Sequence, residues 1–308
     1  MSMEGFQSHH FTLRQLQYVL AIEQTGGFGA AARLCGVSQP SLSAQVAKLE
    51  EALGVQVFER HSRGVRVTAG GRVLLERLRG VLDGARQLTD TARSLVDPYG
   101  VVLRVGIIPT VAPYLLPSVV ESLRAAERSP AVHWIEMRTS WCERALADGE
   151  LDAMVIADPP AVANTSEVDL GWEPFYVIVP RDHEISGPVT LAQVADHEVL
   201  LLDDGNCLTD HTVALCLQPG ARQSPYRATS MATLVQMVAA GLGISVVPGA
   251  AVPAETRRAH VRAVPLAASG VGRTLRLVWR TKSPVGALLE DLAGQLQAAL
   301  LAALSDLP

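Results

Sequence analysis

Four cysteines are the side chains of this 308-residue chain best suited to redox or nucleophilic chemistry: Cys35, Cys142, Cys207 and Cys216. They are neither dense nor regularly spaced, so they do not indicate the disulfide framework of a small secreted protein. Each thiol therefore needs its own explanation in a reducing compartment. We expect Cys35 to be a core residue beside Leu34, and no partner is identified for Cys142.

Cys207 has the sequence context of a reactive thiol. The three residues before it, Asp-Gly-Asn at 204–206, are typical of turns and helix caps, and the apolar residues after it recur at helical spacing. This pattern predicts Cys207 in the first turn of a helix, where the dipole and free backbone N–H groups stabilise a thiolate. The opposing interpretation is that Cys207 and Cys216 are small buried hydrophobic residues, the usual environment of free cysteine.

The bulk composition predicts a globular chain of two or three domains, because 48% of residues are hydrophobic and 19% are charged. The net charge of -5 is uneven. Residues 1–96 carry 11 basic against 8 acidic side chains, and the remainder carries 15 against 23. A basic first third suits a nucleic-acid-binding module. The N-terminus resembles no signal peptide and no run of 18 apolar residues occurs, so we expect a cytoplasmic protein without membrane contact.

The first third has the pattern of a winged helix-turn-helix. Residues 12–25 predict a first helix, and residues 29–34 and 38–50 predict two more, joined by a tight turn at Gly36. Residues 57–68 predict a β-hairpin wing. The predicted DNA contacts are polar residues at the start of the third helix and arginines of the wing: Ser38, Gln39, Pro40, Ser41, Ser43, Arg60, Arg63 and Arg66. The plainer alternatives are an ordinary helical hairpin and a solvated charged turn.

The rest of the chain predicts a multidomain α/β protein. A long amphipathic helix at 69–97 would act as linker and dimerisation element between a 1–68 DNA-binding domain and a 98–308 regulatory domain. Apolar strands at 101–108, 153–157, 176–180 and 275–279 alternate with helical segments. Because the last strand returns after a middle block, we expect two lobes, with the first built from both ends of the domain and a ligand cleft between them.

The run AARLCGVSQPSLSAQVAKLEEALGVQVFER at 31–60, followed by VTAGG, resembles the N-terminal domain of LysR-type transcription regulators. The resemblance extends over nearly the whole chain. It implies a winged helix-turn-helix, a linker-helix dimer and a two-lobed effector domain similar to periplasmic binding proteins. It also implies a homotetramer on promoter DNA that acts on RNA polymerase, and it implies a regulator rather than an enzyme.

Three further segments resemble the OxyR group of hydrogen-peroxide sensors: 105–117, 200–216 and 228–248. The resemblance implies that Cys207 reacts with peroxide, that Cys216 resolves the product to a disulfide, and that a thiol-disulfide reductant resets it. It also implies that Thr110 and Thr139 contact peroxide or its water, with Asn206 and Asp210 in support. Asn206 departs from the histidine usual before the reactive cysteine. No metal or organic cofactor is implied.

Local alternatives stay open for three of these side chains. Thr110 and Thr139 could each cap the helix that follows, which is the commoner task of a threonine after a strand. His211 lies one turn after Cys207 and could raise the thiolate fraction when protonated, or could be exposed without a role.

A helix over 207–216 would separate the two cysteines by about 13 Å along its axis. A disulfide needs about 4.4 to 6.8 Å between Cα atoms. Disulfide formation would therefore have to unwind the segment, which makes the covalent step itself the conformational switch.

Two other functions use the same residues. In the first, the cleft binds a small organic effector and the cysteines are inert. In the second, the chain is a thiol peroxidase with Cys207 as nucleophile, against which the DNA-binding pattern argues.

Overall fold

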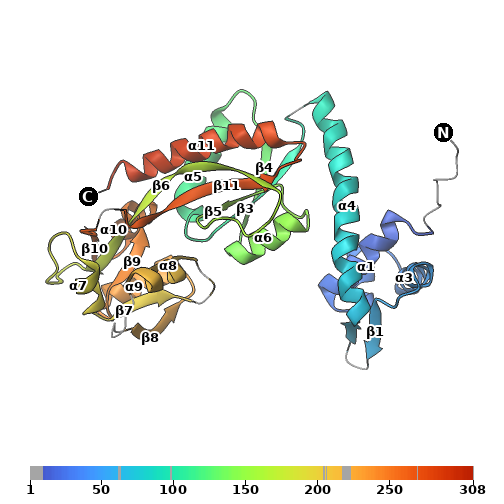
Figure 1. The fold of residues 1–308 in the computed structure, drawn as a ribbon, viewed down its shortest axis with the longest axis horizontal. Coiled ribbons are helices and arrows are strands. Elements are labelled where there is room, and N and C mark those ends of the chain that lie inside the picture. The colour runs from blue at the N-terminus through green and yellow to red at the C-terminus, as the bar shows by residue number, and fades with distance from the viewer. Residues whose placement is uncertain are drawn as a thin grey trace. The chain divides into compact units, whose positions relative to one another are not determined.

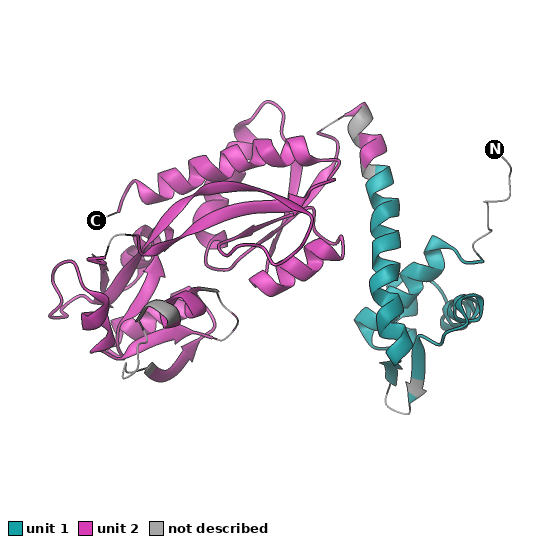
Figure 2. Ribbon diagram, in the orientation of Figure 1, with its two compact units in different colours: residues 1–90 teal, residues 91–308 magenta. Residues whose placement is uncertain are grey.

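The chain divides into two compact units, residues 1–90 and 91–308, in a computed structural model (Figure 2). The structure describes residues 10–61, 64–97, 99–203, 205, 207–216, 223–268 and 270–307. Within these ranges the side chains at 60, 90, 94, 95, 207, 214–216 and 223 are not described. Arg63 and Asn206 lie outside the described residues, as do the side chains of Arg60, Cys207 and Cys216. The predicted domain boundaries at 68 and 97 stay predictions.

The first unit is a small helical domain with a hairpin. Its elements are α1 (Leu13–Thr25), α2 (Phe28–Leu34), α3 (Gln39–Leu53), β1 (Phe58–His61), β2 (Gly64–Val67) and most of α4 (Ala69–Val96). Thr12 and Gln15 form a capping box at α1, and Ser38 accepts a hydrogen bond from the Ser41 amide to cap α3. These caps explain why the helices begin where the sequence predicts.

The core of this unit buries one face of α3, formed by Leu42, Val46 and Leu49. Cys35 is only half-buried at the edge of this cluster, so the expectation that it is a core residue is wrong. Helix α4 contributes Leu75 and Leu78 to the core. It leaves four apolar residues exposed at intervals of seven or eight: Val73, Val81, Leu88 and Val96.

The second unit alternates strands and helices along the chain (Figure 1). Its elements are β3 (Val102–Ile107), α5 (Ala112–Ala125), β4 (Ala131–Glu136), α6 (Thr139–Ala147), β5 (Ala153–Ile156), β6 (Thr165–Pro180), α7 (Leu191–Ala195), β7 (Val199–Leu202), α8 (Cys207–Cys216), β8 (Gln223–Ala228), α9 (Met231–Ala239), β9 (Ser245–Pro248), a 3₁₀ turn η2 (Gly249–Ala251), α10 (Val252–Arg258), β10 (Val261–Pro265), β11 (Gly272–Arg280) and α11 (Gly286–Leu304).

Two separate hydrophobic clusters confirm the two predicted lobes of this unit. The main sheet has the order β10-β6-β11-β5-β3-β4, and β9 also pairs with β6. The first half of β6 pairs with β11 in one lobe, and its second half pairs with β9 and β10 in the other. Strand β11 returns to the first lobe to pair with β5, as expected. The long strand β6 is therefore the backbone connection between the lobes.

Helix α11 covers one face of the first lobe together with α5, and α6 contacts strands β3, β5 and β11 of the same sheet (Figure 1). By length and composition α11 could cross a membrane. Its apolar side is nevertheless packed inside the lobe, where seven residues are buried: Leu288, Leu289, Leu292, Ala293, Leu296, Ala299 and Leu300. This is the burial pattern of a core helix.

Gly243 allows the second lobe to close against β7. Its φ of +148° lies in the region that favours glycine, and a Cβ there would stand 2.3 Å from the Glu198 carbonyl oxygen. The close approach lets the Ile244 amide donate to the Glu198 carbonyl at 2.9 Å, and lets the Leu200 amide donate to the Ile244 carbonyl at 2.8 Å.

We expect Gly243→Ala to lower the free energy of unfolding by about 1–3 kcal/mol, because both the φ angle and the backbone contact resist a Cβ. Gly294→Ala is the matched control, since an added Cβ within α11 meets no atom within 4 Å. The free energy of unfolding of that variant should rise by about 0.5–1 kcal/mol, because alanine has a higher helix propensity than glycine. Urea unfolding of both proteins measures the difference, and an equal response would contradict this account of Gly243.

Candidate functional site

Helix α8 begins at Cys207 and ends at Cys216. The prediction that Cys207 lies in a first helical turn is confirmed. Nine residues at the α-helical rise separate the two Cα atoms by about 13 Å. A disulfide needs about 4.4 to 6.8 Å. In the helical form of α8 these two cysteines cannot be bonded to each other.

The first two turns of α8 are anchored along one face. Leu208, Thr209 and Thr212 are buried. The Thr209 hydroxyl donates to the Leu202 carbonyl at 3.0 Å, and the Thr212 hydroxyl donates to the Leu208 carbonyl at 2.7 Å. Both buried hydroxyls are therefore satisfied by backbone. Asp210 is exposed on this helix, and its predicted supporting role stays a prediction.

Three adjacent parallel strands of the first lobe end at the same edge of the sheet. The two threonines predicted to contact peroxide lie next to this edge. Strand β3 pairs in parallel with both β4 and β5. Thr110 follows β3, Thr139 follows β4, and Asp158 follows β5. Because the carboxyl ends of parallel strands share an edge, these three residues come from one side of the lobe, where open α/β sheets bind ligands.

His211 brings α8 to this edge. Its Nε2 lies 2.8 Å from the Asp158 Oδ1, and its ring centroid lies 5.8 Å from that of Phe175. The hydrogen bond from His211 lowers the pKa of the Asp158 carboxyl, so Asp158 is ionised at neutral pH. His211 is half-buried and paired with Asp158, so the expectation that it is exposed is wrong.

Thr110 is held by a buried ion pair rather than by a helix cap. Its hydroxyl accepts a hydrogen bond from Arg273 Nη1 at 2.8 Å, and its carbonyl accepts one from Nη2 at 3.2 Å. Arg273 Nε lies 2.7 Å from Glu173 Oε2, with both side chains buried. Helix α5 has no side-chain cap, so capping by Thr110 is excluded. The Thr110 hydroxyl keeps its own hydrogen to donate.

Thr139 also lacks the alternative role of a cap. It is the first residue of α6, which has no side-chain cap, and its buried hydroxyl has no hydrogen-bond partner among the described residues. The Asp203 Oδ1 is buried in the same way, while its Oδ2 accepts from Arg138 Nη2 at 2.7 Å. Thr139 and Asp203 therefore have unused hydrogen-bonding capacity between the start of α6 and the approach to α8, which suits a small polar molecule.

The sequence analysis missed Asp158, Glu173 and Arg273. A signal existed for two of them. Arg273 alternates with buried Leu275 and Leu277 along β11, and Glu173 alternates with Phe175 along β6. A charged residue at an inward strand position predicts a buried partner of opposite charge. Asp158 follows a strand without any local pattern.

Cys142 is a core residue. Its side chain is fully buried, and burial raises the pKa of its thiol to about 12. A thiol with that pKa stays protonated at neutral pH and reacts slowly.

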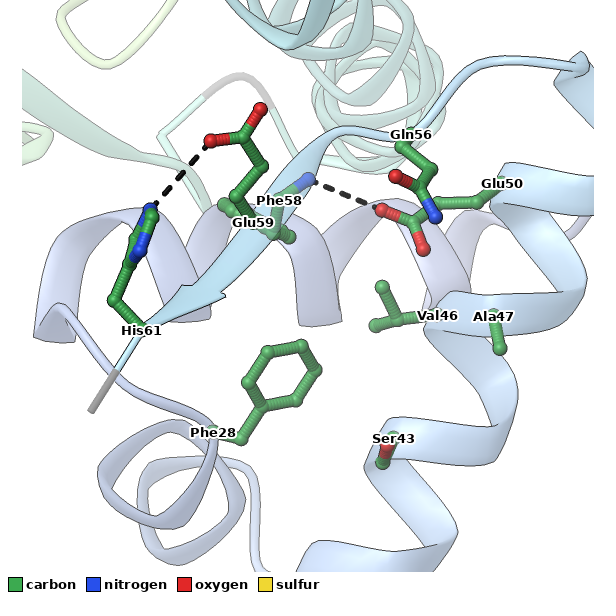
Figure 3. A pocket seen from close by; sticks show the side chains of 9 residues that line it. All are labelled: Phe28, Ser43, Val46, Ala47, Glu50, Gln56, Phe58, Glu59 and His61. Carbon is green, nitrogen blue, oxygen red and sulfur yellow. Dashed lines mark hydrogen bonds and ion pairs between the residues drawn. The ribbon is translucent and has the colours of Figure 1, made fainter. Parts of the chain in front are cut away.

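The first unit presents a polar helix end beside a hairpin. Ser38, Gln39, Pro40 and Ser41 are exposed at the start of α3, and Arg66 is exposed on β2. Strands β1 and β2 pair antiparallel as predicted for the wing. A cavity of about 440 Å³ lies between α3 and β1, lined by Ser43 and by Phe28, Val46 and Phe58, among others (Figure 3). Their DNA contacts stay predictions.

Glu50 joins α3 to the hairpin. Its Oε1 accepts a hydrogen bond from the Val57 amide at 2.7 Å. It accepts a second from the Phe58 amide at 3.1 Å (Figure 3). One carboxylate therefore sets the position of β1 relative to the helix that carries the predicted base contacts.

Two family models match the chain. The model described as "Bacterial regulatory helix-turn-helix protein, lysR family" matches residues 13–72, and "LysR substrate binding domain" matches residues 100–301. The chain belongs to the LysR family. The matches confirm the predicted fold class, a helix-turn-helix followed by a two-lobed α/β domain.

Within the LysR family the chain groups with the OxyR regulators. It is 36% identical over 289 residues to the DNA-binding transcriptional dual regulator OxyR of Escherichia coli K12, which covers 93% of this chain and 95% of that one. It is also 36% identical over 291 residues to a probable hydrogen peroxide-inducible genes activator of Mycobacterium leprae, covering 93% and 94%.

Solved structures of OxyR proteins are also similar to this chain. Full-length OxyR of Pseudomonas aeruginosa with a cysteine-to-aspartate substitution has a TM-score of 0.76 and 35% identity, covering 94% of this chain and 95% of that one. A cysteine-to-serine mutant of Corynebacterium glutamicum OxyR, H₂O₂-bound, has a TM-score of 0.65 and 34% identity, covering 97% and 95%.

For this LysR-family chain we expect Glu50→Ala to lower DNA affinity and to lower the free energy of unfolding by about 1–3 kcal/mol, because two backbone amides lose their acceptor. Glu59→Ala removes the same charge from an exposed position, where the carboxylate lies 3.5 Å from His61. Fluorescence anisotropy with labelled DNA compares the two, and equal affinities would contradict a positioning role for Glu50.

Proposed function

We propose that this chain is a DNA-binding transcription regulator that senses hydrogen peroxide through a reversible disulfide between Cys207 and Cys216. The observation that carries the proposal is that one ten-residue helix begins and ends at these cysteines. The similarity to regulators named for hydrogen peroxide supports it.

The chemistry follows from a thiolate at a helix N-terminus. The Cys207 thiolate attacks one peroxide oxygen, the O–O bond breaks, and a sulfenic acid forms while the second oxygen leaves as hydroxide and becomes water. The Cys216 thiol then attacks the sulfenic sulfur and a second water leaves with formation of the disulfide. Two electrons pass from the thiols to peroxide, and a thiol-disulfide reductant returns them.

Peroxide support is assigned to Thr110 and Thr139, whose hydroxyls each retain hydrogen-bonding capacity. Both come from the edge to which His211 ties α8. Asn206 and Asp210 are proposed in support on the basis of sequence resemblance alone.

The disulfide acts as a switch because α8 cannot stay helical once it forms. We assign the readout to a homotetramer on promoter DNA in the cytoplasm, with contacts to RNA polymerase. The exposed apolar residues of α4, Val73, Val81 and Leu88, support pairing of two chains through that helix.

One cavity between the lobes, among the residues that the structure describes, is small for an organic effector. The cavity lined by Thr110, Tyr114, Ser230 and Glu255 has a volume of about 180 Å³. Pockets for drug-sized ligands have about 300–1,000 Å³. A thiol peroxidase would use the same Cys207, but it would leave the helix-turn-helix unit without a role, so we do not assign enzyme activity.

The test of the sensor is non-reducing peptide mapping after brief exposure to near-stoichiometric hydrogen peroxide. We expect a rapid disulfide between Cys207 and Cys216, absent from Cys207→Ser and Cys216→Ser, together with loss of about one short helix in circular dichroism. Cys142 should stay a free thiol because its pKa is raised by burial. If both cysteines stay free while DNA binding is intact, the sensor assignment is wrong.

DNA recognition makes a separate prediction. Gln39→Ala and Ser41→Ala should weaken binding to the specific operator by about 1–3 kcal/mol each if their side chains contact bases. Arg66→Ala should weaken binding to all sequences and reduce its salt dependence. Titrations of operator and unrelated DNA at two salt concentrations separate the two effects. Unchanged operator binding in all three variants would contradict the assignment of α3 and the wing.

A further inference from the structure

His211 is held in one orientation from two sides. Its Nε2 lies 2.8 Å from Asp158 Oδ1, and its ring packs against the ring of Phe175 at a centroid distance of 5.8 Å. Phe175 is itself buried, and the guanidinium carbon of Arg273 lies over its ring, 6.0 Å from the ring centroid. A histidine on a helix surface would ordinarily rotate freely, so these contacts specify a direction for the imidazole.

The second ring nitrogen of His211 is Nδ1. Nδ1 is buried and makes no hydrogen bond to any described residue. A buried nitrogen that lacks a partner is costly, and such atoms call for a specific role. Because Nε2–H donates to the Asp158 carboxylate, Nδ1 is the nitrogen at which a proton can be given or taken. The arrangement is a carboxylate-oriented imidazole with one reactive nitrogen.

The position of His211 relates this nitrogen to the redox chemistry. His211 is the fifth residue of α8, four residues after Cys207. Residues four apart lie on the same face of an α-helix, about 6 Å apart along its axis. His211 is also tied to Asp158 at the edge of the first lobe next to which Thr110 and Thr139 lie. Peroxide bound at this edge would therefore lie close to both position 207 and the imidazole.

We propose that His211, oriented by Asp158, is the proton donor to the oxygen that leaves when Cys207 is oxidised. This inference rests on the proposed peroxide-sensing function. The Cys207 thiolate forms a bond to one peroxide oxygen, the O–O bond breaks, and the Nδ1 proton of the imidazolium passes to the departing oxygen. The products are the sulfenic acid, one water and a neutral imidazole, which regains its proton from solvent.

Asp158 contributes by keeping the imidazole aligned. Its carboxylate is ionised because the hydrogen bond from His211 lowers its pKa, and Arg273 and Arg276 act in the same direction. With the carboxylate on Nε2, a proton that His211 gives to a reacting group leaves from Nδ1. A proton donor matters here because hydroxide is a far poorer leaving group than water.

Two reagents with different leaving groups separate proton donation from other roles. Hydrogen peroxide needs a proton on its leaving oxygen, whereas iodoacetamide releases iodide and needs none. The same Cys207 thiolate attacks both reagents. The ratio of the two rate constants therefore cancels changes in the thiolate fraction and in access to the thiol.

The experiment uses the full-length protein and follows the Cys207 peptide by quenched-flow mass spectrometry with each reagent. In His211→Gln we expect the ratio of the peroxide rate to the alkylation rate to fall by about 10²-fold or more, the usual size of general acid catalysis. In Asp158→Asn, which retains the imidazole, the ratio should fall by less. His183→Gln is the control, since that histidine packs against His197 in the second lobe, and its ratio should not change.

Each outcome is decisive. A ratio unchanged in His211→Gln overturns the proposal, whether both rates stay the same or both fall together, because a parallel fall assigns His211 to thiolate formation or to structure. A wild-type Cys207 that is alkylated but inert to peroxide rejects the sensor function itself, and the proton donor with it. Thermal unfolding of each variant identifies loss of fold, and Asp158→Asn then provides the second measurement.

Discussion

A disulfide cannot bridge the two ends of an intact ten-residue helix. With Cys207 and Cys216 at those ends, the helical rise holds their Cα atoms about 13 Å apart. This is more than twice the most common Cα–Cα distance across a disulfide. Any bond between them therefore exchanges the hydrogen bonds of α8 for another conformation. Sensing and switching become one event in one segment, and no separate device is needed to convert oxidation into movement.

Helix α8 is attached to the rest of the second unit by noncovalent contacts that a disulfide can break. Leu208, Thr209 and Thr212 bury one face of its first two turns, the Thr209 hydroxyl donates to the Leu202 carbonyl, and His211 ties the helix to Asp158. These contacts are individually small, since a hydrogen bond contributes about 1 kcal/mol net. A covalent bond can overcome them, whereas the buried pair of Arg273 and Glu173 beneath belongs to the rigid framework.

This framework sets which residues lie next to α8. Strand β6 runs through both lobes and carries Glu173 and Phe175 at the point where it passes from one to the other. Arg273 on β11 binds Glu173 and Thr110 together, so the loop after β3 is fixed to the centre of the sheet. In the DNA-binding unit, Glu50 joins the hairpin to α3 through two backbone hydrogen bonds.

The local elements and their order along the chain could be predicted from the residues alone. Capping by Thr12 and Ser38, the inward face of Leu42, Val46 and Leu49, and the start of a helix at Cys207 all depend on residues within a few positions of each other. Such signals are visible in a linear pattern because helix caps and periodicity are short-range physics. Family resemblance supplied the interpretation of the two cysteines.

The pairing of polar side chains that are far apart in the chain could be seen only in the folded protein. Thr110 and Thr139 have the sequence context of caps but are not caps, and Thr110 is bound instead by Arg273, 163 residues away. The partner of His211 is Asp158, 53 residues earlier, which no spacing predicts. Strand β6 also extends well before its predicted start at 176, because pairing with β11 stabilises a polar stretch that lacks the apolar signal of a strand. Long-range pairing follows from how strands and lobes pack, and packing leaves no local period in the sequence.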